Sequence, residues 1–261
     1  VRAAVSKVEG KVLPDSVLWK GVFNLSVNQG VAGLAKKGLQ NIFDQAYDSN
    51  ALCLSSLADP ETRKLMLKWG FKTVSYERIS ESHNQAAAQL RDILDKEGFD
   101  SCILKGQSLA FLYEHPEMRQ PGDMDIWVRP KDSKGDFAED RRRVLELFRS
   151  KWKVSKPTYH HCQAKVFKDI PVEVHYLPAW LYNPIANRKL LRFFREQAPE
   201  QFSNTNELGF NVPTIRFNLI FLLVHLSKHA LESNVQVKQL VDYANVLKNS
   251  TEEDRKGAFR F

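Results

Sequence analysis

Residues 122–128 constrain the fold more than any other segment of this 261-residue chain. They read Gly-Asp-Met-Asp-Ile-Trp-Val, so acidic and apolar side chains alternate with the two-residue period of a β-strand. A strand would carry Asp123 and Asp125 on one face, with their Cα atoms ~6.6 Å apart. Two carboxylates so close repel each other unless a cation lies between them, and oxygen ligands favour a hard ion such as Mg²⁺. The alternative is an exposed strand whose polar face holds two acids by chance.

A third acid and a glycine turn make a site more specific. Residues 171–175, Pro-Val-Glu-Val-His, predict a second strand, on which Glu173 points opposite to its valine neighbours and faces the aspartates if the strands pair. His175 shares that face, either at the site or in a structural hydrogen bond. Upstream, an apolar run at 101–104 leads into Lys-Gly-Gln-Ser at 105–108, which predicts a strand-to-helix turn that favours a phosphate.

The rest of the pattern predicts an α+β fold, with a small mixed sheet flanked by helices. We expect an N-terminal helical region at 1–98, an α/β core at 99–178 and a C-terminal helical region at 179–261. The predicted helices are one that starts at Asp59-Pro60, one over about 80–96, and others at 136–150, 187–197, 213–231 and 237–247. The strand that carries Glu173 extends over about 172–176, and another strand at about 159–167 is separated from it by a turn at 168–171.

Composition excludes several classes of protein. With 43% hydrophobic and 26% charged residues, the chain is predicted to be globular rather than disordered. No apolar run approaches the ~18 residues that span a bilayer, so we expect no membrane insertion. The three cysteines, Cys53, Cys102 and Cys162, are widely spaced, which favours a reducing, cytoplasmic location. The absent N-terminal Met and an acidic helix start at 251–254, close to the last residue, predict that both native ends are missing.

Positive charge is concentrated in one segment. Residues 129–168 contain twelve Lys or Arg against five Asp or Glu, and this excess equals the net charge of +7. The segment predicts local attraction for polyanions, or else the solvated face of a helix that carries Arg141–Arg143.

Taken in order, these motifs resemble a known signature. Gly106 with Ser108, Asp123-Met124-Asp125 and the later Glu173 resemble the nucleotidyltransferase signature of the DNA polymerase β-like superfamily. The longer motifs are similar to a largely uncharacterised bacterial nucleotidyltransferase family, over roughly 99–247. They are Leu-Lys-Gly at 104–106, Arg-Gln-Pro-Gly-Asp-Met-Asp at 119–125, Val-Glu-Val-His at 172–175 and Gln-Leu-Val-Asp at 239–242.

The resemblance implies an enzyme that moves a nucleoside monophosphate from a nucleoside triphosphate to a hydroxyl or phosphate acceptor and releases pyrophosphate. Asp123 and Asp125 would bind two Mg²⁺ ions, with Mn²⁺ as an alternative. Glu173 would complete the ion that activates the attacking hydroxyl and would accept its proton. Gly106, Gln107 and Ser108 would hold the triphosphate. Lys105 and Arg119 are candidate phosphate partners, or else ordinary surface cations, and His175 is a further candidate for nucleotide binding because it shares the face of Glu173. The insertion of Gln107 between the glycine and the serine departs from the usual turn.

Several alternatives stay open. The chain could be an inactive nucleotide-binding module, or a nucleic-acid-binding protein that uses the basic segment. The acceptor could be a small molecule, RNA or a protein, and the oligomeric state is undetermined. His225 and His229 share a helix face, where packing is favoured over metal binding. His160-His161 receives no role, because neighbours on a strand point to opposite faces. Asp242 either closes the nucleotide pocket or anchors two helices.

Overall fold

A single long helix, α5 (Pro60–Lys96), connects the two parts of the chain. The computed structural model describes residues 16–48 and 59–259, so Cys53 and both chain ends lie outside the described residues. Unit 1 comprises residues up to 80 together with 113–120 and 236–238, and unit 2 comprises 81–112, 121–235 and 239–261. The predicted three-part division at 98 and 178 stays a prediction.

Unit 1 is built from helices around two tryptophans. It contains α2 (Ser16–Asn28), α3 (Ala32–Asp48), the first part of α5 and the 3₁₀ turn η1 (Pro116–Met118). Its core includes Trp19, Phe23, Leu39 and Trp69. Trp69 Nε1 donates a hydrogen bond to the backbone oxygen of Ala32 at 2.8 Å, which satisfies the buried indole N–H.

The start of α5 follows the predicted capping pattern. The backbone N–H of Thr62 donates to Asp59 Oδ2 at 2.9 Å, and Pro60 occupies the first turn, where its missing N–H costs nothing. The helix runs for 37 residues and ends before Gly98, whose φ of +79° suits a glycine. The prediction of two separate helices was wrong, because no proline or turn sequence interrupts residues 70–80.

Unit 2 contains a four-stranded mixed sheet, which confirms the predicted α+β class. The strands are β1 (Phe99–Ile103), β2 (Met124–Pro130), β3 (His161–Ala164) and β4 (Val172–His175), in the order β1-β2-β4-β3. β2 is antiparallel to β1 and parallel to β4, and β3 and β4 form an antiparallel hairpin. β3 is shorter than predicted because residues 158–160 turn: Thr158 Oγ1 accepts a hydrogen bond from the His161 N–H.

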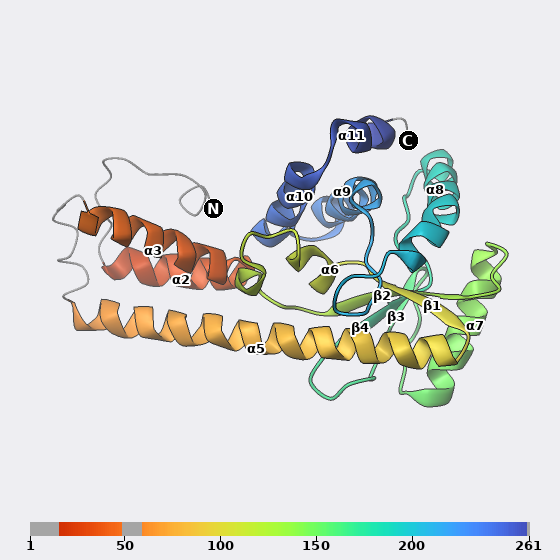
Figure 1. Cartoon of the computed structure of the whole chain (residues 1–261), viewed down its shortest axis with the longest axis horizontal. Helices are drawn as coiled ribbons and strands as arrows, with labels where there is room; N and C mark the ends of the chain where they lie inside the picture. Colours follow the sequence, from red (N-terminus) through yellow and green to blue (C-terminus); the bar gives the residue numbers. More distant parts are fainter. Residues whose placement is uncertain (1–15, 49–58, 260–261) are drawn as a thin grey trace. The chain divides into compact units, whose positions relative to one another are not determined.

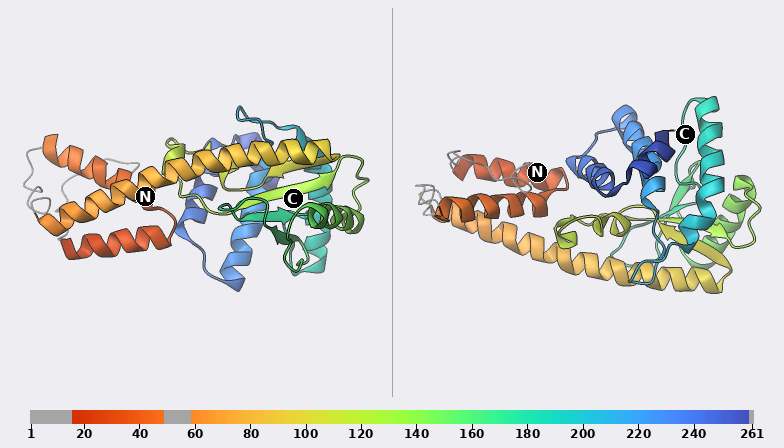
Figure 2. Two further views of the ribbon diagram at one scale, coloured as in Figure 1. Left: turned by 90° about the horizontal axis from the view of Figure 1, so that it is seen from below. Right: turned by 45° about the horizontal axis from the view of Figure 1, so that its top comes forward.

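Helices cover both faces of this sheet (Figures 1 and 2). Met124, Ile126 and Val128 of β2 pack in one cluster with residues of α5 and of α7 (Phe137–Lys151). Trp127, which points the other way, packs with residues of α8 (Pro184–Ser203) and α9 (Ile215–Glu232). Burial on both faces explains why β2 carries a continuous apolar run after Asp125. The remaining helices are α6 (Gln107–Ala110), α10 (Val237–Asn249) and α11 (Glu252–Phe259).

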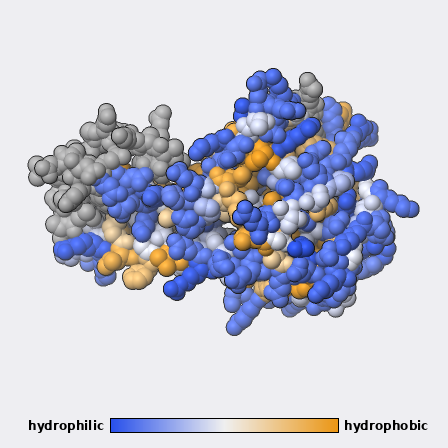
Figure 3. Space-filling view, viewed as in Figure 1, coloured by the Kyte–Doolittle hydropathy of each residue, from blue (hydrophilic) through white to orange (hydrophobic). Residues whose placement is uncertain are grey.

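A helix that spans a membrane requires a minimum length and hydropathy. Among the helices that the structure describes, none is both long and apolar enough to cross a bilayer. The face shown in Figure 3 is mostly hydrophilic, with smaller apolar areas. The cytoplasmic location stays a prediction.

The packing of α5 on the sheet predicts the effect of a cavity. Leu90 is fully buried in the cluster that joins α5, α7 and the sheet. We expect Leu90→Ala to lower the free energy of unfolding by about 2–5 kcal/mol in urea denaturation. The control is Leu231→Ala, which makes the same substitution in unit 2 at a side chain that is 77% exposed, and which should change stability by less than about 0.5 kcal/mol. Equal losses would contradict this account of the core.

Candidate active site

The parallel pairing of β2 and β4 brings acidic side chains together. Asp125 is the register partner of Glu173, and His175 lies two residues farther along the same face of β4. His175 Nε2 lies 3.1 Å from Asp125 Oδ1 and 3.1 Å from Glu173 Oε1. Asp125 and His175 are buried, whereas the Glu173 side chain is 20% exposed. One imidazole therefore joins two carboxylates that are 48 residues apart in the sequence.

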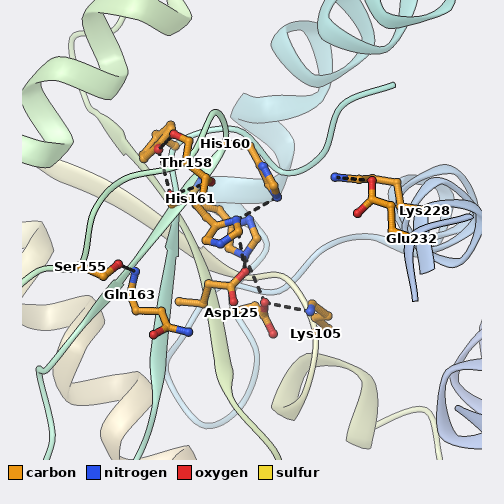
Figure 4. Close-up of polar contacts among 12 residues, drawn as sticks. Lys105, Asp125, Ser155, Thr158, His160, His161, Gln163, Lys228 and Glu232 are labelled. Carbon is orange, nitrogen blue, oxygen red and sulfur yellow. Dashed lines mark hydrogen bonds and ion pairs between the residues drawn. The ribbon is translucent and has the colours of Figure 1, made fainter. Parts of the chain in front are cut away.

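Lys105 adds a cation to this group. The N–H of Leu104 donates to the backbone oxygen of Asp125 at 2.8 Å, which extends the β1–β2 pairing and places the next residue beside Asp125. Lys105 Nζ lies 2.9 Å from Asp125 Oδ1. Figure 4 shows Asp125 between Lys105 and the imidazole rings.

Electrostatic interactions favour the charged forms of Asp125, Lys105 and His175. Burial raises the pKa of Asp125, but Lys105 and His175 outweigh it and hold the pKa well below its usual range. Burial lowers the pKa of Lys105, yet Asp125, Asp123 and Glu173 together raise it overall. Burial likewise opposes a charged His175, and hydrogen bonds to Asp125 and Glu173 still raise its pKa. The positive charges of Lys105 and His175 thus compensate the acids.

Asp123 and Glu173 lie at a cavity. Asp123 directly precedes β2 and has an exposed surface. Repulsion from Asp125, together with partial desolvation of the carboxyl group, raises its pKa. Burial also raises the pKa of Glu173, but His175 lowers it overall. Both acids line a cavity of about 740 Å³, whose wall includes Lys153, Lys165 and Lys168.

Two histidines that the sequence analysis left without a role join the group. His161 Nδ1 lies 2.9 Å from His160 Nε2 and 3.5 Å from Glu173 Oε1. Burial lowers the pKa of His161, and it lowers the pKa of His160 to about 2. The strand rule failed because His160 lies in the bend before β3, where side chains do not alternate. The adjacency of two histidines was the only signal in the sequence.

The predicted phosphate turn has the required backbone but a very short helix. Gly106 has a φ of +75°, and α6 behind it has four residues, so its dipole adds little. Gln107 Nε2 donates to His83 Nδ1 at 3.2 Å. Among the described residues, Ser108 Oγ and Gln107 Oε1 are buried polar atoms without a hydrogen-bond partner.

The donor atoms fit a divalent cation. Asp125, Glu173 and His175 each offer one ligand atom, and these atoms lie within 4.8 Å of one another. Two carboxylates suit Mg²⁺ or Mn²⁺, and the ammonium of Lys105 already shows that a cation is stable beside them.

Comparison with protein families identifies the chain. Residues 15–260 match the model of a family described as uncharacterised nucleotidyltransferases. The chain belongs to this nucleotidyltransferase family. Its bacterial origin and its placement in the DNA polymerase β-like superfamily stay predictions.

Comparisons with individual proteins add less. The chain is similar to a solved structure, that of an antigenic nucleotidyltransferase-like protein from Paracoccidioides brasiliensis. The identity is 14% and the TM-score 0.41, over 68% of this chain and 85% of the other. A search of curated proteins finds no match.

The structure does not place every predicted site residue of this nucleotidyltransferase in the acidic group. Arg119 belongs to unit 1, so its phosphate-binding role stays a prediction. Asp242 is buried on α10. His225 stacks on Phe221 and meets His229 at a ring distance of 4.5 Å, which is the packing that the helical spacing favoured.

The contact between His83 and Gln107 predicts a pH dependence. Burial lowers the pKa of His83 from 6.5, so below about pH 6.5 the unfolded chain binds a proton that the folded chain excludes. The free energy of unfolding therefore decreases as the pH is lowered, by up to about 1.4 kcal/mol per pH unit from this group. His83→Gln should remove this part of the acid sensitivity in urea denaturation at neutral and mildly acidic pH. Asn84→Ala, at the next residue of α5, should keep it. Identical pH dependence in wild type and His83→Gln would contradict the assignment.

Proposed function

We propose that this protein transfers a nucleoside monophosphate from a nucleoside triphosphate to an acceptor hydroxyl or phosphate and releases pyrophosphate. The observation that carries the proposal is the convergence of Asp125, Glu173 and His175 beside Lys105, in a chain of the nucleotidyltransferase family. The exposed Asp123 and the cavity give a substrate access to this group.

Asp125, Glu173 and Asp123 would hold Mg²⁺, with Mn²⁺ as the alternative. When bound, the metal supplies Lewis-acid polarisation of the phosphoryl oxygens and neutralises their charge. His175 orients both carboxylates through its Nε2, and the depressed pKa values of Asp125 and Glu173 keep both ionised at neutral pH.

The chain's own residues position the reaction and move one proton. An acceptor oxygen attacks the α-phosphorus, a new O–P bond forms, and the bond from the α-phosphorus to the bridging oxygen breaks. The electron pair of that bond leaves with pyrophosphate. Glu173, the ionised and partly exposed carboxylate, takes the proton of the acceptor hydroxyl. Lys105 and the backbone N–H groups of Gly106, Gln107 and Ser108 stabilise phosphate charge.

The cavity supports an anionic substrate. Lys153, Lys165 and Lys168 line its wall, and all three are exposed. None of the three forms an ion pair with any residue that the structure describes. Part of the basic segment thus lies beside the acids, where it can attract a triphosphate or an anionic acceptor.

Removal of the acids should abolish transfer. We expect Asp125→Asn and Glu173→Gln each to lower label transfer at least about 100-fold, because each removes a metal ligand. The assay incubates the full chain with each α-³²P-labelled nucleoside triphosphate, Mg²⁺ and fractionated cell extract, and follows both the labelled product and pyrophosphate. Asp95→Asn removes an exposed acid of α5 and should retain wild-type activity.

The outcomes separate the proposal from an inactive binding module. Binding of a fluorescent nucleoside triphosphate by wild type, with no label transferred to any fraction, would identify a module without turnover. Unchanged transfer by Asp125→Asn would show that the Asp125 carboxylate is not required for the reaction. Circular dichroism of each variant checks that it is folded, so that a loss of transfer can be assigned to the missing side chain rather than to unfolding.

The lysines of the cavity should set nucleotide affinity. Joint replacement of Lys153, Lys165 and Lys168 by alanine should weaken nucleoside triphosphate binding between about threefold and a hundredfold, given ~0.2–1 kcal/mol for each exposed charge contact. Replacement of Lys189, Lys248 and Lys256 changes net charge equally and should leave the affinity near wild type. If both triple variants bind equally well, the cavity is not the nucleotide site. RNA binding that survives Asp125→Asn and falls steeply with salt would favour the nucleic-acid-binding alternative.

A further inference from the structure

Three imidazole rings meet at the edge of the acidic group. His160, His161 and His175 each offer one ring nitrogen, and these nitrogens lie within 4.8 Å of one another. His161 and His175 are register partners in the β3–β4 hairpin, and His160 reaches them from the preceding bend. The ring centroids lie 4.3 to 5.7 Å apart, and the rings meet at an angle rather than stacking flat (Figure 4).

We propose that this histidine trio, with Glu173 as a fourth ligand, binds a transition-metal ion of the Zn²⁺ class. Imidazole nitrogen suits Zn²⁺ and its neighbours in the transition series, whereas Mg²⁺ prefers oxygen ligands. The site shares His175 and Glu173 with the acidic group, and the imidazoles of His160 and His161 change its preference to a softer ion. The proposal concerns metal binding alone, so it does not depend on nucleotidyl transfer.

Three of the six separations between the donor atoms lie near the value for a tetrahedral site. Two ligands that lie 2.0–2.1 Å from a tetrahedral Zn²⁺ are about 3.3 Å from each other. The observed separations bracket this value: 2.9 Å from His160 Nε2 to His161 Nδ1, 3.5 Å from His161 Nδ1 to Glu173 Oε1, and 3.1 Å from Glu173 Oε1 to His175 Nε2. Three nitrogens and one oxygen, contributed by four side chains, is a common zinc ligand count.

Hydrogen bonding alone leaves this group incomplete. Among the described residues, His160 Nδ1 and His175 Nδ1 are buried without a hydrogen-bond partner. A buried imidazole nitrogen without a partner is costly, so the hydrogen bonds of this group do not satisfy every ring nitrogen. The proposed ligand atoms are His160 Nε2, His161 Nδ1 and His175 Nε2, so the two unpartnered Nδ1 atoms are not themselves ligands of the ion.

The surrounding residues hold the trio in place. The hydroxyl of Tyr176, next to His175, donates to the backbone oxygens of Thr158 and His161. Thr158 Oγ1 in turn accepts a hydrogen bond from the His161 N–H. These bonds tie the 158–161 segment to the end of β4, which is the support that ordered metal ligands need.

Direct metal titration tests the site. The metal-free full chain is titrated with Zn²⁺ against a chromogenic chelator and, separately, with Co²⁺, whose visible absorption is intense in four-coordinate sites. We expect one Zn²⁺ per chain, and at least about a tenfold loss of affinity when His160 and His161 are both changed to alanine. His115→Ala removes a histidine outside the trio whose side chain is 40% exposed, and it should keep wild-type affinity.

Two results would overturn the proposal. Zn²⁺ affinity that is unchanged in the double variant would place the ion on Asp125, Glu173 and His175 instead. Wild type that binds no Zn²⁺ below about millimolar concentration would show that the trio is only a hydrogen-bonded cluster. Should the double variant fold poorly, His160→Asn alone, at the partly exposed ring before β3, should still lower affinity and the Zn²⁺-induced rise in Tm.

Discussion

Parallel pairing of β2 with β4 is the constraint on which the rest of the site depends. A slip of one residue would turn either Asp125 or Glu173 to the opposite face, into the apolar cluster that β2 and β4 share with α5 and α7. Burial of both faces of β2 forbids such a slip, because Met124, Ile126 and Val128 would then lose their places in that cluster. The packing of the core therefore determines the register of β2 and β4, and the register determines the positions of Asp125 and Glu173.

Charge balance explains why a carboxylate as buried as Asp125 is tolerated. An isolated ion in such a position costs several kcal/mol, and a paired one needs good geometry to recover that cost. Lys105 and His175 both contact Asp125 Oδ1, at 2.9 and 3.1 Å. The backbone bond from Leu104 to Asp125 makes the position of Lys105 a consequence of strand pairing rather than of side-chain flexibility. The arrangement favours specificity of position over stability, as expected of a functional site.

Local patterns predicted much of this arrangement. The two-residue alternation located the acids of β2 and β4, the capping pattern at Asp59-Pro60 located the start of α5, and the helical pattern at 136–150 located α7. Features that depend on contacts between distant residues were not predicted. No local sequence pattern indicates that a bend before β3 turns His160 toward His175. The continuity of α5 was missed because its first and last parts each carry a helical apolar pattern of their own. The roles implied by the family resemblance depend on ligands, and they stay predictions.

The basic segment shows how one composition serves two purposes. On α7, Arg142 pairs with Glu139 and Glu146, and Arg143 pairs with Asp132, so these arginines form the solvated helix face. After α7, Lys153, Lys165 and Lys168 lie outside any helix, line the cavity of Asp123 and Glu173, and form no ion pair with a residue that the structure describes. Charge that a helix neutralises locally contributes little to the field at a distance, whereas unpaired charge on loops beside a cavity is focused there. The excess positive charge of residues 129–168 therefore contributes to the electrostatic field mainly from the loops around β3.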